Sequence, residues 1–207
     1  MKYLHLFLMA VLIFFSNSCS KPGNEILLDS FEGKLNHQTV DYGASIGSSL
    51  KIEAEKQLKV CGRQSMKMTY SLARDGYMWA ARGYNIDVKG AARWLVKPTD
   101  IQWEEFDRFS LYMYGSNSGG VVNFDIKDAG GEMWRFVIKD DFKGWKEIVC
   151  PFSSFFVRKD WQPSSAERNE LLDFPIMSFQ FEPRGTTKGI YYFDCVKLLK
   201  ISKEQTP

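Results

Sequence analysis

The sequence has few histidines, few cysteines and almost no excess of charge. Its 207 residues include two histidines and four cysteines, and 27 basic residues balance 25 acidic ones to leave a net charge of +2. Because nucleic-acid binders carry a concentrated positive surface, nucleic acid is not an expected partner. The cysteines show no CxxC or zinc spacing, so the sequence does not indicate a structural zinc site.

Catalysis by a nucleophile and a histidine base also has little support. Once the first 18 residues are set aside, His37 is the only histidine, and it lies in a polar, loop-like segment. A Ser-His-Asp or Cys-His arrangement needs a histidine held beside its nucleophile. We therefore expect that the protein is not an enzyme.

One long apolar run is present, near the N-terminus. Residues 4–15 are apolar apart from His5 and follow Lys2, but they are fewer than the roughly 20 residues that span a bilayer. This pattern is typical of a signal peptide over residues 1–18. Ser16-Asn17-Ser18-Cys19 resembles a bacterial lipobox and predicts lipidation of Cys19, a tether over residues 19–25 and a lipid-anchored place in the bacterial cell envelope. Ordinary cleavage without lipidation is the alternative.

The remaining cysteines are Cys61, Cys150 and Cys195. Their odd number allows at most one internal disulfide. Cys150 and Cys195 lie in strand-like apolar runs, where a free cysteine usually acts as a small core residue. Both are therefore expected to be buried, and their disulfide state stays open.

Short strand-like runs separated by Gly, Asn, Asp and Pro dominate residues 26–200. They predict strands at 26–31, 65–72, 77–84, 92–96, 109–114, 121–127, 132–139, 146–151, 176–182 and 190–199. One helix is predicted, where Ser164 and Glu167 form a capping box before Leu171 and Leu172. The expected fold class is all-β, an antiparallel β-sandwich or jelly roll with one short helix. Residues 201–207 are expected to be a tail.

Strand periodicity separates a core face from a polar and aromatic face. Phe109, Leu111 and Met113 alternate with a serine and two tyrosines. Phe124 alternates with polar residues in the next strand, and the neighbours of Trp134 in the strand after it include Arg135. In a later strand, the phenylalanines at 179 and 181 alternate with polar residues. These strands are expected to belong to one sheet. Its non-core face would then carry Tyr112, Tyr114, Asn123, Asp125, Arg135, Gln180 and Glu182.

The turn between residues 127 and 132 predicts the register of two of these strands. A three-residue loop, Asp128 to Gly130, with a left-handed glycine at its third place, sets Phe124 opposite Trp134. Asp125 and Arg135 are then diagonal neighbours on the non-core face.

Several segments in order resemble one known family. They are residues 29–33 (DSFEG), 103–115 (WEEFDRFSLYMYG), 125–136 (DIKDAGGEMWRF), 144–155 (GWKEIVCPFSSF) and 190–194 (IYYFD). This order is similar to the family 11 carbohydrate-binding modules and the related complex I intermediate-associated proteins. The resemblance implies a galactose-binding-like jelly roll over residues 26–200.

The resemblance implies that a polysaccharide or oligosaccharide lies across a concave sheet. Flat rings stack on the apolar faces of sugars while fixed polar groups meet the hydroxyl groups, so the polar face above supplies the expected ligand residues, together with Trp79 near the rim. One alternative is an assembly or structural lipoprotein that uses this face for a protein partner, and a less favoured one is a polysaccharide-cleaving enzyme with Asp125 and Glu182 as its two carboxylates. The face could also be the ordinary solvated side of a sheet.

The resemblance also implies one structural calcium where the first and last strands meet. Asp29, Glu32 and Asp194 resemble the acids that hold it, and carboxylate oxygens are the ligands that calcium prefers. Cys195 stands where a further acidic ligand is common in the family.

Overall fold

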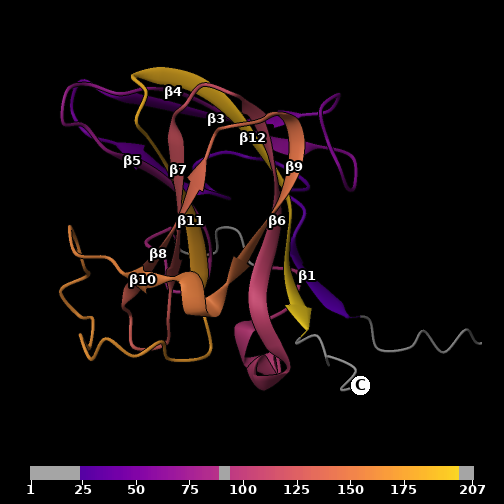
Figure 1. Cartoon of the computed structure of the whole chain (residues 1–207), viewed down its shortest axis with the longest axis vertical. Coiled ribbons are helices and arrows are strands. Elements are labelled where there is room, and N and C mark those ends of the chain that lie inside the picture. The colour runs from indigo at the N-terminus through magenta and orange to yellow at the C-terminus, as the bar shows by residue number, and fades with distance from the viewer. Residues whose placement is uncertain (1–23, 89–93, 201–207) are drawn as a thin grey trace, which may run out of the picture.

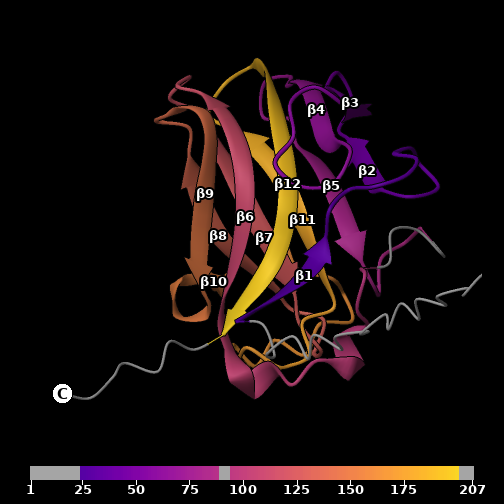
Figure 2. The same cartoon turned by 90° about the vertical axis from the view of Figure 1, so that its right-hand side faces the viewer.

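The computed structural model describes residues 24–88 and 94–200 as two antiparallel sheets packed face to face (Figures 1 and 2). The predicted signal peptide, Cys19, the tether up to residue 23 and the tail at 201–207 lie outside the described residues. In the part that is described, no helix is long and apolar enough to cross a membrane.

The first sheet, called sheet A, has the strand order β3-β4-β12-β6-β9, and β1 also pairs with β12. Its strands are β1 (Glu25–Asp29), β3 (Ser49–Glu55), β4 (Ser65–Ser71), β6 (Phe106–Ser116), β9 (Lys143–Pro151) and β12 (Lys188–Lys200).

The second sheet, called sheet B, has the order β10-β8-β7-β11-β5-β2. Its strands are β2 (Asp41–Ala44), β5 (Met78–Gly83), β7 (Val121–Lys127), β8 (Met133–Lys139), β10 (Phe156–Val157) and β11 (Ser178–Arg184). Short 3₁₀ turns occur at η1 (Pro98–Asp100), η2 (Trp103–Glu105) and η3 (Phe152–Ser154). The predicted all-β sandwich is confirmed, and the described part is almost without helix.

The core lies between the sheets and is built from every second residue of their strands. Phe109, Leu111 and Met113 of β6 are fully buried, as the alternation predicts. Aromatic rings join the two layers: Phe181 of β11 stacks on Phe193 of β12 with ring centroids 3.9 Å apart. Such buried rings supply much of the apolar surface that holds a sandwich together.

The predicted helix at Ser164 is wrong. The chain turns at Ser164 and then runs without regular structure. Its backbone finds distant partners, because the N–H of Glu167 donates to the carbonyl of Gly130 (3.0 Å) and the N–H of Glu170 donates to the buried carboxylate of Glu132 (3.1 Å). Glu170 also has φ +58°, which a right-handed helix excludes.

The predicted strand at 92–96 is also wrong where it is described, because residues 94–96 form no strand. The strands β2, β3 and β10 were not predicted. β2 has four residues and β10 only two, so they carry little of the apolar alternation on which the prediction depends. β3 (SLKIEAE) does alternate, with Leu50, Ile52 and Ala54 between polar residues, and the prediction missed it.

The register of β7 and β8 differs from the prediction by two residues. Phe124 lies opposite Phe136 instead of Trp134, and Asp125 lies directly opposite Arg135. A shift by two keeps every side chain on its predicted face. The five-residue turn follows from the buried Asp128, whose carboxylate accepts hydrogen bonds from the N–H of residue 132 (2.7 Å) and the Trp134 indole (2.9 Å).

The left-handed residue of this turn is Gly131, with φ +80°, and not Gly130 as predicted. Glycine adopts this conformation without the steric cost of a Cβ atom.

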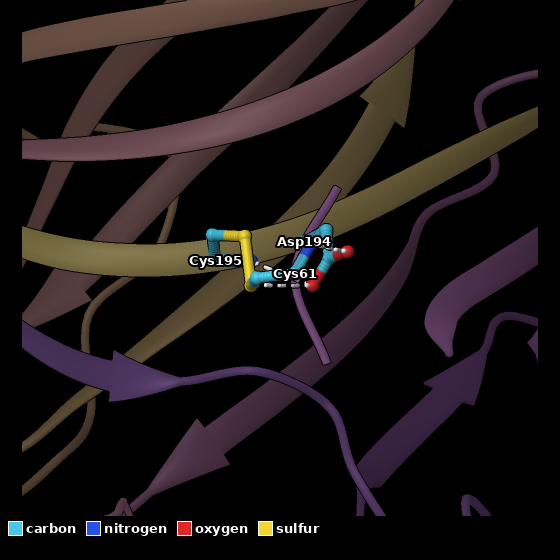
Figure 3. Close-up of side chains that lie close together, drawn as sticks. All are labelled: Cys61, Asp194 and Cys195. Atoms are coloured by element: carbon cyan, nitrogen blue, oxygen red, sulfur yellow. Dashed lines mark hydrogen bonds between the residues drawn. A yellow bond between two sulfur atoms is a disulfide. The ribbon is translucent and has the colours of Figure 1, made fainter. Parts of the chain in front are cut away.

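One disulfide links Cys61 to Cys195 across 134 residues, with Cα atoms 6.1 Å apart (Figure 3). Cys150 and Cys195 are both buried, as expected. Cys150 is a free thiol, whereas Cys195 belongs to the one internal disulfide that the number of cysteines allows. The bond fastens the loop after β3 to the middle of β12. Proximity of Cys61 to β12 depends on the path of that loop, which strand periodicity does not report.

Candidate functional site

A groove of about 810 Å³ runs over the outer face of sheet B. Its floor comes from β5, β7, β8 and β11, and the loop that follows β10 forms one side. The predicted ligand residues Trp79, Gln180 and Glu182 line it, together with Arg158 and Trp161, which the prediction did not include.

A network of ion pairs lies beneath the groove, centred on the fully buried carboxylate of Asp125. Arg135 donates to both of its oxygens, with Nε at 2.8 Å and Nη2 at 2.9 Å. Arg158 Nη1 (3.1 Å) and the Gln180 amide (3.1 Å) donate to the same carboxylate. A buried charge needs partners of this kind, because burial without them is costly.

Glu182 is the second buried acid of this network, with 2% of its side chain exposed. It accepts hydrogen bonds from Arg135 Nη2 and Arg184 Nη2, and Arg158 Nη2 lies 3.4 Å from it. All four carboxylate oxygens of Asp125 and Glu182 are therefore held by guanidinium or amide nitrogens. A glycosidase pair needs one carboxyl that exchanges a proton with the glycosidic oxygen and another free to reach the sugar or a water molecule, so this arrangement disfavours the enzyme alternative.

Two shifts of pKa accompany the network. Burial acts to lower the pKa of Arg135, but the hydrogen bonds and charge of Asp125, with the charges of Glu182 and Asp160, outweigh it and raise that pKa. Hydrogen bonds from Arg158 lower the pKa of Asp160, against a smaller opposing effect of burial. The acids of this network are thus paired with its arginines.

Aromatic side chains stand at the edge of the groove. Trp79 of β5 is partly exposed and lies nearly parallel to Tyr77, with ring centroids 6.2 Å apart at 22°. Its indole N–H donates to Asp41 (3.2 Å), and its ring covers Gly43 so closely that a Cβ atom there would lie 2.5 Å from it. The ring is therefore held over β2 in a fixed orientation.

Trp161 stands on the loop after β10 and is 53% exposed. The guanidinium of Arg158 lies over its ring, 5.5 Å from the centroid. Trp161 therefore lies at the rim of the groove. No strand pattern marks Arg158, because it follows β10 directly.

Three predicted ligand residues lie below the surface of the groove, and one of them is Arg135, which donates hydrogen bonds to Asp125 and Glu182. Asp125 is covered by Arg135 and Arg158, and Asn123, opposite Glu182 in the β7–β11 pair, is only 6% exposed. All three share the predicted face. Their position makes them support for the floor.

The expectation that Tyr112 and Tyr114 share this face is wrong. Their strand β6 belongs to sheet A, which Figure 2 shows in the other layer of the sandwich. Both tyrosines alternate with buried core residues of β6, so they lie on the opposite outer surface. Tyr114 packs edge to face with Trp145 and Tyr192, with centroids 5.5 and 5.6 Å away. Alternation assigns residues to faces of a strand, but it does not tell which sheet the strand joins.

The three predicted calcium ligands are bonded to nitrogen donors. Asp29 is buried against Arg82, whose Nη2 donates at 2.9 Å. Glu32 accepts the N–H of Arg63 (2.6 Å), and this bond is the main cause of its lowered pKa. Asp194 accepts the N–H groups of Val60 (2.8 Å) and residue 61 (3.0 Å), while burial raises its pKa.

The donor set at this corner does not fit calcium. Within residues 24–88 and 94–200, the only group of three candidate metal ligands is Cys61, Asp194 and Cys195 (Figure 3), and its two sulfurs form the disulfide. Calcium prefers six or more oxygens. Calcium at this corner stays a prediction that the arrangement of donors does not support.

Comparison with known proteins points to one family. A family model described as carbohydrate binding domain (family 11) matches residues 16–201. Over 185 residues the chain is 30% identical to Endoglucanase H of Acetivibrio thermocellus, covering 88% of this chain but 19% of that protein.

Two solved modules of Clostridium thermocellum have the same fold. One is a family 11 carbohydrate-binding module in complex with a β-1,3-1,4-mixed-linked tetrasaccharide (TM-score 0.64, 25% identity, 85% of this chain and 95% of that one). The other is the family 11 module of the cellulosomal cellulase Lic26A-Cel5E (TM-score 0.64, 22% identity, 86% and 95%).

Proposed function

The chain belongs to the family 11 carbohydrate-binding domains, and we propose that it binds a β-linked glucan in the groove on the outer face of sheet B. The observation that carries the proposal is a groove with partly exposed aromatic rings, Trp79 and Trp161, above a rigid polar floor. A sugar ring presents C–H faces that stack on aromatic rings and hydroxyl groups that need fixed donors and acceptors.

The charges of the floor favour a neutral saccharide. Asp125 and Glu182 are paired with Arg135, Arg158 and Arg184. Lys127, which also lines the groove, forms no salt bridge with any residue that the structure describes, but the nearby charges of Asp41 and Asp87 act on it. A uronic-acid polymer would need a free cation. The solved relative in complex with a mixed-linked glucan tetrasaccharide supports a neutral β-glucan as the ligand class.

The protein is proposed to act without catalysis, as an exported module held at the membrane by a lipid on Cys19. The Cys61–Cys195 disulfide supports export, because disulfides persist mainly in oxidising compartments. Use of the same face by a protein partner is the alternative. The matched relative named Endoglucanase H extends far beyond the matched segment, so enzymatic domains elsewhere in it do not carry over.

Calorimetric titration of the purified protein with the mixed-linked tetrasaccharide tests the proposal. Trp79→Ala should weaken binding by about 1–3 kcal/mol, the scale of one lost stacking or hydrogen-bonding partner. Tyr114→Ala removes a partly exposed ring from the opposite surface and is the matched control. Equal loss in both variants, or no binding by the unaltered protein to any β-glucan tested, would contradict the proposed site.

A further inference from the structure

Arg158 connects the floor of the groove to its rim. The side chain is 9% exposed, and its guanidinium donates inward to Asp125 (Nη1, 3.1 Å). On the outward side, Nε and Nη2 donate to the two oxygens of Asp160 at 2.8 and 3.1 Å. The same group lies over the ring of Trp161. One buried cation therefore contacts two exposed residues of the rim.

The backbone around Arg158 is also fixed to sheet B. Its N–H donates to the carbonyl of Met133 (2.9 Å), and its own carbonyl accepts a hydrogen bond from the Gln162 side chain (2.9 Å). The side chain of Gln162 also makes two hydrogen bonds with the backbone of Met133. It accepts from the Met133 N–H (2.7 Å) and donates to the Met133 carbonyl (2.8 Å). The loop is thus pinned at both ends of the segment that bears Trp161. Between these two points, the exposed side chains of Asp160 and Trp161 are not held by the backbone hydrogen bonds and need other contacts to fix their orientation.

We propose that Arg158 is a positioning residue that holds Trp161 and Asp160 in place before saccharide arrives. This inference rests on the proposed binding of β-glucan in the groove. Ordering a free side chain on binding costs affinity, and an interaction that orders it in advance removes this cost. A planar guanidinium suits the role, because it pairs with a carboxylate by two parallel hydrogen bonds and stacks on an indole at the same time.

The first experiment needs no ligand. Arg158→Lys keeps the positive charge but loses the planar guanidinium that pairs with Asp160 and lies over the Trp161 ring. The environment of that ring should therefore change, and the indole N–H signal of Trp161 in ¹⁵N-labelled protein should shift or broaden. The signal is assigned with Trp161→Phe, and the buried Trp94 and Trp134 serve as internal controls. Should Arg158→Lys fail to fold, Asp160→Asn loosens the outer pair at a half-exposed position and should move the same signal. A Trp161 signal unchanged in the folded variants would overturn the inference.

The second experiment is a double-mutant cycle with the mixed-linked tetrasaccharide. Arg158→Lys should weaken binding roughly threefold to tenfold, the range that ordering one side chain costs. In the Trp161→Ala background the same substitution should have little further effect. The control is Arg184→Lys, which alters the same floor through Glu182 but is not bonded to Asp160, and its effect should be equal in both backgrounds.

The two experiments separate failure of this inference from failure of the proposed function. Equal losses from Arg158→Lys with and without Trp161 would show that Arg158 does not act through that ring, and the inference would be wrong although saccharide binds. If the unaltered protein binds no β-glucan, the proposed function is wrong, and the indole signals alone decide whether Arg158 orders Trp161.

Discussion

Adjacent residues of β7 have opposite environments. Phe124 is fully buried in the core, where its ring lies within 6.0 Å, centroid to centroid, of those of Phe109, Phe155, Phe179 and Phe181. Asp125 points to the other face and is buried as well. Strand periodicity predicts these directions correctly. It cannot predict that arginines from β8 and from the loop after β10 close over Asp125.

Phe124→Ala should lower the free energy of unfolding by about 3–5 kcal/mol, because a ring is removed from a packed core and leaves a cavity. Urea denaturation measures the change. A loss under about 1 kcal/mol would show that the site relaxes or that the ring is not in the core.

Asp125→Ala should also destabilise the fold, by about 3–5 kcal/mol, because two guanidinium groups lose the buried carboxylate that they share. Replacing a solvent-exposed residue on the outer face of an ordinary sheet would not destabilise the fold to this extent. The matched control is Asp160→Ala in the same denaturation experiment, since that carboxylate is 49% exposed and its loss should cost far less. Equal effects of the two substitutions would contradict the buried network.

At the scale of elements, a disulfide lies near the corner between β1 and β12, where the family resemblance implies a structural calcium. Cys61 and Cys195 join the loop after β3 to β12. Next to the disulfide, Asp194 accepts a hydrogen bond from the backbone N–H of Cys61. Reduction, or Cys61→Ser, should lower the free energy of unfolding by about 2–5 kcal/mol, because a link over 134 residues restricts the unfolded chain. Thermal melts with and without reductant measure the loss.

The same melts test calcium at this corner. We expect a chelator to leave the melting temperature unchanged, because the carboxylates of Asp29, Glu32 and Asp194 are already bonded to nitrogen donors. A ligand that binds only the folded state must raise its stability. A lower melting temperature in chelator that calcium restores would therefore show that these carboxylates rearrange around the ion.

Prediction from the sequence succeeded for most strands with strong apolar alternation. It failed where contacts between residues far apart in the sequence determine the local structure. β7 matches its predicted span of 121–127. The capping box at Ser164 is a local signal, and the buried Glu132 outcompetes it by accepting the N–H of Glu170. Of the predicted ligand residues, Trp79, Gln180 and Glu182 line the groove. Tyr112 was misplaced because the order of strands in a sheet depends on the path of the whole chain.

At the scale of the whole molecule, the ends of the described chain and the groove belong to different sheets. β1 begins and β12 ends at one end of sheet A (Figure 2). There the N–H of Lys200 donates to the carbonyl of Asn24 (2.8 Å). The groove lies on the outer face of sheet B. Attachment to a membrane through Cys19, five residues before Asn24 in the sequence, would therefore join the sandwich at sheet A, away from the saccharide.

Cys19→Ser should move the protein from the membrane fraction to the soluble fraction and abolish labelling by a fatty-acid probe, because acyl chains are the proposed attachment. Affinity for the mixed-linked tetrasaccharide should stay the same, since the groove lies on the other sheet from the attached end. Fractionation, acyl labelling and titration of one preparation measure all three properties. Unchanged membrane partitioning of the variant would contradict the lipid anchor. Loss of saccharide affinity together with the anchor would show instead that the N-terminal segment takes part in the binding site.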